Sequence, residues 1–143
     1  GDWVLFKALG IAELGAALRS CQGTLISLQR NPQAGETGVL EAAAGARVHD
    51  FSALNDDLEA MLAVLDILDE YIGVSNTNVH LRACVGRITR VLVPAPPEWR
   101  WMAAGRFSPW FPGFPTYRQT SDGDWSGALA SLAHDLRVAG EAR

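Results

Sequence analysis

Four polar residues that can cap a helix follow directly on an apolar run in the middle of the chain: Ser75, Asn76, Thr77 and Asn78. The run at 71–74 is typical of a buried parallel strand, and Gly86 can end the helix that follows. Such a junction directs free backbone N–H groups, hydroxyls and the helix dipole at one point, which suits an anion and most often a phosphate. The sequence therefore predicts a phosphate-binding turn, although the same residues also fit plain helix caps.

Three further side chains could act near this turn. His80 falls one turn into the predicted helix, where it either packs as a core or capping residue or faces the bound anion. Arg82 is expected to be solvated or salt-bridged rather than bound to phosphate. Arg100 lies between two tryptophans, so it either reaches an anion or stacks on an indole ring as a cation–π pair.

Other candidates stand at predicted strand ends or in the segment 95–113. Gln29 ends a strand at the ligand edge and either meets the ligand or hydrogen-bonds a loop. Asp50 and Glu98 are candidate carboxylates, but nothing in their context marks them as an acid–base pair. Three tryptophans fit either core packing around a long loop or a sugar-binding or inter-domain surface: Trp99, Trp101 and Trp110.

The composition is that of one globular domain with a sizeable core: 143 residues, of which 48% are apolar and 20% charged. The net charge of −4, with scattered basic residues, argues against a nucleic-acid or anionic-membrane surface. Charged residues interrupt every long apolar stretch and no signal peptide is evident, so we expect no membrane span. Cys21 and Cys84 make no metal or disulfide pattern, and a cytoplasmic protein is expected.

The hydrophobic pattern predicts strands that alternate with helices. Predicted strands occupy residues 24–29, 46–51, 71–75, 90–94 and 115–119. Predicted helices occupy residues 8–21, 39–44, 55–65 and 78–85, with a last helix after Asp124. Asn55 is expected to cap the third of these helices, with Leu58, Met61, Leu62 and Leu65 on its inward face. This alternation predicts an α/β fold with a Rossmann-like parallel sheet flanked by helices, which binds ligands beyond the carboxyl ends of its strands.

Two stretches resemble the C-terminal half of GT-B glycosyltransferases, most closely bacterial proteins that join tetratricopeptide repeats to a heptosyltransferase-like or O-GlcNAc-transferase-like domain. They are IGVSNTNVHLRACVG at 72–86 and RVLVPAPPEWRWMAAGRFSPWFPGFPTYRQ at 90–119. The second contains the most specific pieces, which are Pro-Glu-Trp-Arg-Trp at 97–101, Ser-Pro-Trp-Phe-Pro at 108–112 and Tyr-Arg-Gln at 117–119. The resemblance covers residues 8–136.

The resemblance implies a half-domain that binds a nucleotide-diphosphate sugar as donor, without a metal or other cofactor. It places five residues around the diphosphate: Ser75, Asn76, Thr77, Asn78 and His80. It leaves Gln29 and Arg100 as candidates for the cleft. An unidentified acceptor would receive the sugar, and the N-terminal half of the same parent protein would hold that acceptor.

The chain departs from the family pattern at the turn and at its start. Ser75, Asn76 and Thr77 stand where the family has Asp, then Thr or Ser, then Gly or Ala, so the turn lacks a carboxylate. The chain also starts later than family domains do, so we expect 1–143 to be an inactive fragment of a longer protein, with an open sheet edge that could pair two copies.

Three hypotheses follow. The chain is the donor-binding half of a glycosyltransferase, or a degenerate GT-B-like interaction module that adjoins tetratricopeptide repeats. A weaker third reading is an unrelated phosphate-binding α/β protein, although the usual dinucleotide and P-loop motifs are absent from the sequence.

Overall fold

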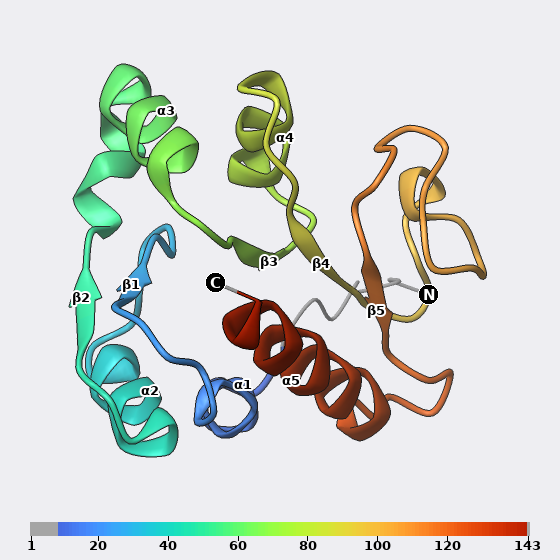
Figure 1. The fold of residues 1–143 in the computed structure, drawn as a ribbon, viewed down its shortest axis with the longest axis horizontal. Coiled ribbons are helices and arrows are strands. Elements are labelled where there is room, and N and C mark those ends of the chain that lie inside the picture. Colours follow the sequence, from blue (N-terminus) through green and yellow to red (C-terminus); the bar gives the residue numbers. More distant parts are fainter. Residues whose placement is uncertain (1–8, 143) are drawn as a thin grey trace, which may run out of the picture. The chain divides into compact units, whose positions relative to one another are not determined.

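The computed structural model describes residues 9–142 and shows an α/β fold in which parallel strands alternate with helices (Figure 1). The chain divides into two compact units. Unit 1 contains Leu62–Ala128, and unit 2 contains Leu9–Met61 with residues 129–142. The predicted alternation in a Rossmann-like pattern is confirmed, and the hydrogen bonds divide the five strands between two sheets.

Unit 2 is built on a two-stranded parallel sheet. Its elements are α1 (Ile11–Leu18), β1 (Leu25–Ser27), α2 (Glu36–Ala44), β2 (Val48–Asp50), the 3₁₀ helix η1 (Ser52–Asp56) and the start of α3 (Leu58–Ile67). Leu25 pairs with Val48 and Ser27 with Asp50. Helices α1 and α2 pack closely at Gly15, where an added Cβ would lie 2.6 Å from the Cβ of Ala43. The predicted helix 8–21 began at a residue outside the described part of the chain.

Two predictions about α3 are wrong. Asn55 does not cap this helix, because it lies in η1 and its side-chain amide donates to the carbonyls of Leu28 and Ser52. Asp57 takes the capping role, since its Oδ1 accepts the N–H of Ala60 at 3.0 Å. Leu58 was expected on the inward face but is 59% exposed.

Unit 1 is built on a three-stranded parallel sheet in the order β3-β4-β5. After the end of α3 it contains β3 (Ile72–Val74), α4 (Thr77–Cys84), β4 (Arg90–Val93), the 3₁₀ helix η2 (Trp99–Trp101), β5 (Thr116–Arg118) and the start of α5 (Ser126–Glu141). Val74 pairs with Leu92, and Leu92 in turn pairs with Tyr117. The carboxyl ends of all three strands therefore lie at one edge, which is the edge expected to bind ligands.

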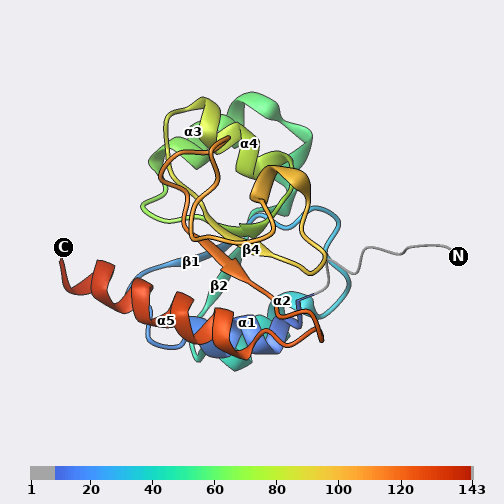
Figure 2. The same cartoon turned by 90° about the vertical axis from the view of Figure 1, so that its right-hand side faces the viewer.

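One face of this sheet carries the core of unit 1. Val91 and Val93 are two residues apart in β4, so their side chains lie on the same face. They pack with Val79 of α4 and with two aromatic residues, Trp101 and Phe114. Figure 2 shows α4 and the segment that follows β4 on the same side of β4. The core thus packs α4 and the segment 95–113, called the tryptophan-rich segment below, against the same strand, β4.

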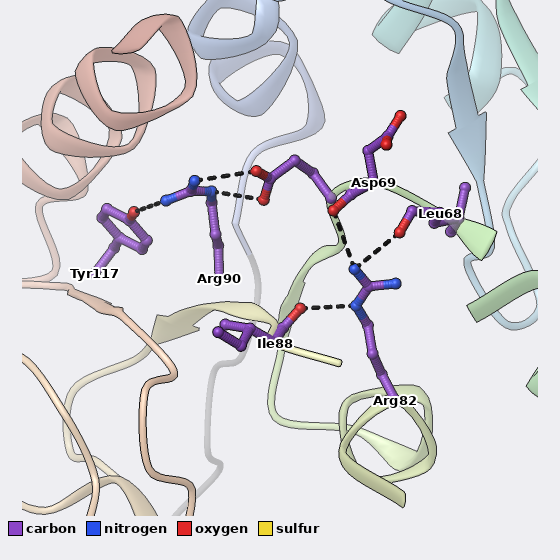
Figure 3. A network of polar contacts seen from close by, with 7 residues as sticks. Leu68, Asp69, Arg82, Ile88, Arg90 and Tyr117 are labelled. Carbon is purple, nitrogen blue, oxygen red and sulfur yellow. Dashed lines mark hydrogen bonds and ion pairs between the residues drawn. The ribbon is translucent and has the colours of Figure 1, made fainter. Parts of the chain in front are cut away.

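Arg82 is a structural residue, contrary to the expectation that it is solvated or salt-bridged. It is 2% exposed, and its guanidinium donates to the carbonyls of Ile88, Leu68 and Asp69 (Figure 3). It also donates to the carbonyl of Leu65. Three of these carbonyls lie in the last turn of α3 or just after it. There a cation is stabilised by C=O groups that have no partner within the helix and by the negative end of the helix dipole. Arg82 therefore fastens α4 to the end of α3.

Arg90 is a half-buried cation of the same region. Its guanidinium forms two hydrogen bonds with the Glu70 carboxylate, at 3.0 and 3.2 Å, and a third with the Tyr117 hydroxyl at 2.9 Å. Figure 3 shows these bonds. Although burial alone would lower the pKa of Arg90, its bonds to Glu70 and Tyr117 leave that pKa raised. Arg90, in β4, therefore links Glu70, which precedes β3, to Tyr117 of β5.

Among residues 9–142, no helix has both the length and the apolar character that a membrane span requires.

Candidate functional site

The turn after β3 has the helix-capping geometry that the sequence predicts. Asn76 is the N-cap of α4 in an extended conformation, and its Oδ1 accepts the N–H of Val79 at 3.1 Å. Thr77 is the first helical residue and is exposed. Gly86 ends the helical segment with a φ of +74°. Helix geometry leaves the first N–H groups of α4 without a partner inside the helix, and the Asn76 side chain accepts one of them, that of Val79.

Asn78 faces inward rather than toward the ligand edge. It is buried, and its side chain and that of Asn76 hydrogen-bond the Tyr71 side chain at the start of β3. Burial raises the pKa of Tyr71 above 10, while the bonds to the two asparagines act in the opposite direction. Asn76 therefore caps the helix, as the capping alternative predicts, whereas Asn78 contacts Tyr71 and Thr77 is exposed.

A carboxylate from the segment after β4 reaches the turn. The hydroxyl of Ser75, which is buried, donates to Oε2 of Glu98 at 3.0 Å. The same Oε2 lies 3.5 Å from Nη1 of Arg100. Ser75, Glu98 and Arg100 thus form one chain of polar contacts at the carboxyl edge of the sheet. Sequence reasoning named Glu98 as a carboxylate but did not place it at the turn; the topology rule that puts the segment after β4 at this edge is the signal that could have done so.

His80 lies beside this polar chain. Its ring contacts the ring of Phe111 with centroids 5.3 Å apart and planes tilted by 57°. Burial lowers the pKa of His80 below 6.5, the positive charge of Arg100 lowers it further, and the negative charge of Glu98 opposes both. The imidazole is therefore neutral at pH 7 and can offer one N–H donor and one acceptor.

The tryptophans fall into two classes. Trp101 is fully buried and stacks on Phe111, with centroids 4.8 Å apart. Trp99 and Trp110 are 62% and 60% exposed and contact each other edge to face, with centroids 5.2 Å apart. The guanidinium of Arg100 lies over the Trp99 ring, 4.7 Å from its centroid, as the cation–π alternative predicts. Core packing therefore holds for Trp101 alone.

Buried or half-buried polar side chains fix the tryptophan-rich segment. The Ser108 hydroxyl donates to the carbonyl of Arg100 and accepts the N–H of Trp110 at 3.1 Å. The guanidinium of Arg118, in β5, donates to the carbonyls of Trp101, Met102 and Gly105. Burial lowers the pKa of Arg118. No sequence pattern indicates the contacts of Arg118, because they join its side chain to backbone groups 13 to 17 residues away.

Gln29 belongs to unit 2 and meets a loop. Its amide donates to Oε2 of Glu36 at 2.9 Å, and the same oxygen accepts the N–H of Gln33. Gln29 therefore contacts the first residue of α2, whose carboxylate also holds the preceding loop through Gln33. The other candidate carboxylate, Asp50, accepts the N–H of Ser52, and that hydrogen bond lowers the pKa of Asp50. The residues brought together at the turn all belong to unit 1.

The charges at the turn nearly balance. Arg100 and Glu98 cancel as a pair, while the N-terminus of α4 contributes a partial positive charge of about one half. A bound phosphate would be attracted to the N-terminal end of the helix, and it would compete with Glu98 for Arg100. The arrangement can therefore bind an anion, provided that Glu98 shifts or exchanges its partner. In the described part of the chain, no group of three or more His, Cys, Asp or Glu residues is placed to hold a metal ion.

Comparison with family models, curated proteins and solved structures finds no match. The glycosyltransferase resemblance thus rests on the motifs of the sequence.

Proposed function

We propose that unit 1 binds the diphosphate of a nucleotide sugar at the turn after β3, as the donor half of a GT-B-type glycosyltransferase. The observation that carries the proposal is the placing of neutral His80 and of Arg100 near the positive N-terminal end of α4. In this role the helix N–H groups and His80 donate to the diphosphate, and Arg100 offsets its charge. Such donors stabilise the leaving nucleotide as the glycosidic bond breaks.

The acceptor and the catalytic base would come from another half-domain of the parent protein, as the resemblance implies. The described residues supply groups that bind and orient the donor. Ser75 has a specific part in this proposal, because its hydroxyl holds the Glu98 carboxylate at the turn, and a bound diphosphate would displace that carboxylate.

A thermal-shift screen with the diphosphates of uridine, guanosine, adenosine and cytidine, and with their sugar conjugates, tests the proposal. We expect one nucleobase series to raise the melting temperature and His80→Ala to abolish the shift. His134→Ala is the matched control, because His134 is exposed on α5. The proposal fails if no compound shifts the wild-type protein, or if His80→Ala leaves the shift unchanged.

A second candidate is the degenerate interaction module beside tetratricopeptide repeats. It is favoured by one observation, namely that the Ser75 hydroxyl is engaged by a carboxylate where a phosphate oxygen would bind. This candidate predicts that Glu98→Gln also binds no nucleotide, and that a repeat domain of the parent protein binds the chain in a pull-down.

A further inference from the structure

Trp99 and Trp110 are large apolar side chains that the fold leaves in water. More than half of each residue is exposed, although Trp101, two residues from Trp99, is fully buried. Burying an indole is among the most favourable contributions that a single side chain makes. A pair of indoles held on the surface is therefore a feature for which folding alone gives no reason, and exposed apolar clusters of this kind commonly mark binding sites.

The geometry of the pair leaves aromatic faces open. The two rings are nearly perpendicular, with an interplanar angle of 86°. Of the four ring faces, this edge-to-face contact occupies one, and the guanidinium of Arg100 occupies one face of Trp99. At least two indole faces are thus free of these contacts, and their exposure makes them accessible to a flat ligand.

The pair is also held in place before any ligand binds. The buried Ser108 hydroxyl links the backbone of Arg100 to that of Trp110, and Arg118 holds the carbonyls of the intervening segment. A site that is already ordered loses little conformational entropy on binding. The polar contacts of Ser108 and Arg118 therefore give the two indoles the fixed positions that a binding surface needs.

The polar groups at the edge of the pair indicate the chemistry of the ligand. Arg100 stacks on Trp99 and pairs with Glu98 at 3.5 Å, so a cationic donor and an anionic acceptor stand together. Sugar hydroxyls donate to a carboxylate and accept from a guanidinium, and the C–H face of a sugar ring packs on an indole. A nucleic acid is disfavoured, because its phosphates would meet Glu98 and a chain of net charge −4.

We propose that Trp99 and Trp110, together with Arg100 and Glu98, form a binding platform for a neutral sugar ring of a glycan. This platform does not rest on nucleotide binding at the turn, because the indole faces are the surface that it uses. In a glycosyltransferase such a platform would hold a sugar of the acceptor. In an interaction module it would anchor the chain to a glycan.

Isothermal titration of the 143-residue protein with neutral tetrasaccharides tests the platform. The probes are the β-1,4-linked tetramers of N-acetylglucosamine and glucose, the α-1,4-linked tetramer of glucose, and an α-linked tetramer of mannose. We expect at least one to bind, and Trp99→Ala and Trp110→Ala each to weaken that binding about tenfold. Trp99→Phe keeps an aromatic face and is expected to retain most of the affinity, which guards against loss of the fold as the explanation.

Phe107→Ala is the matched control, because Phe107 is an exposed aromatic of the same segment. A glycan platform predicts an affinity within about twofold of wild type for this variant. The proposal is overturned if none of the tetrasaccharides binds at millimolar concentration, if both Trp→Ala variants bind like wild type, or if Phe107→Ala weakens binding as much as they do. The last outcome would indicate a broad apolar surface for a protein partner. Titration of the same variants with nucleoside diphosphates separates a failure here from a failure of the turn.

Discussion

The Ser75 hydroxyl donates to Glu98 Oε2 at 3.0 Å, although 23 residues separate the two in the chain. The contact exists because β3 and β4 are parallel neighbours, so the residues that follow them emerge at one edge. It places a carboxylate beside the turn that the sequence marks for an anion. Glu98 therefore acts as an internal competitor for any phosphate that binds there, with Arg100 as the group for which the two compete.

Replacing Glu98 by glutamine is expected to strengthen nucleotide binding. The substitution keeps a hydrogen-bond acceptor for Ser75 but removes the negative charge that pairs with Arg100. We expect the affinity for a nucleoside diphosphate to rise about fivefold, the factor that about 1 kcal/mol of released pairing gives. Calorimetric titration measures it, with Asp66→Asn, which breaks the exposed pair with Arg87, as the control for net charge. An unchanged or weaker affinity would show that Glu98 does not compete.

The stability of the protein is expected to fall as the pH drops through the range where His80 titrates. The pKa of His80 is lowered in the fold, first by burial and then by Arg100. Its folded pKa lies below its unfolded value of about 6.5, so the unfolded state takes up the proton first. The associated stability is present above pH 6.5 and decreases as the pH falls below it. His80→Gln should show a shallower decrease in urea unfolding between pH 7.5 and 5, and equal slopes would contradict this account.

Arg82 is expected to be essential for stability and dispensable for binding. Replacing it by methionine leaves four carbonyl contacts without a donor in a buried site, and we expect a loss of about 3 kcal/mol or more in the free energy of unfolding. Arg87→Met is the control, since its pair with Asp66 is half exposed and should contribute less than about 1 kcal/mol. Similar losses for the two variants in urea titrations would refute a structural role for Arg82.

Two substitutions of Asn76 test separately its role as a helix cap and the effect of charge at the helix N-terminus. Asn76→Ala removes the acceptor for the Val79 N–H, so we expect a loss of about 1 kcal/mol in stability. Asn76→Asp keeps the acceptor and is expected to be nearly as stable as wild type. It also adds a negative charge at the helix N-terminus and should weaken diphosphate binding. If the aspartate variant binds a diphosphate as well as wild type does, the anion does not lie at this helix.

The elements themselves could be predicted from hydrophobic periodicity, and the turn from the order of its residue types. Asn76 and Gly86 have roles that depend only on local backbone geometry. The start of α3 was predicted wrongly because Asn55 and Asp57, two residues apart, can both cap a helix. Asn55 instead donates to the distant carbonyl of Leu28, and Asp57 is the cap. Sequence spacing does not contain that contact.

The two classes of tryptophan could not be told apart in advance. Trp99 and Trp101 lie in a 3₁₀ helix. Residues i and i+2 of such a helix are about 240° apart around its axis, so the two indoles point to different sides. In a β-strand, by contrast, residues 99 and 101 would lie on the same face. Arg82 illustrates the same limit, since three of its four carbonyl partners lie 13 to 17 residues earlier, at the end of α3.

Amide chemical-shift mapping of the ¹⁵N-labelled protein shows where on the chain a nucleoside diphosphate binds. The nucleoside diphosphate that gives the largest thermal shift, or uridine diphosphate if none does, is titrated to millimolar concentration. The account predicts that the largest shifts occur at the amides of residues 75–80, with smaller shifts at Glu98 and Arg100. Shifts confined to other parts of the chain, or no shifts at all, would contradict a nucleotide-sugar site at the turn after β3.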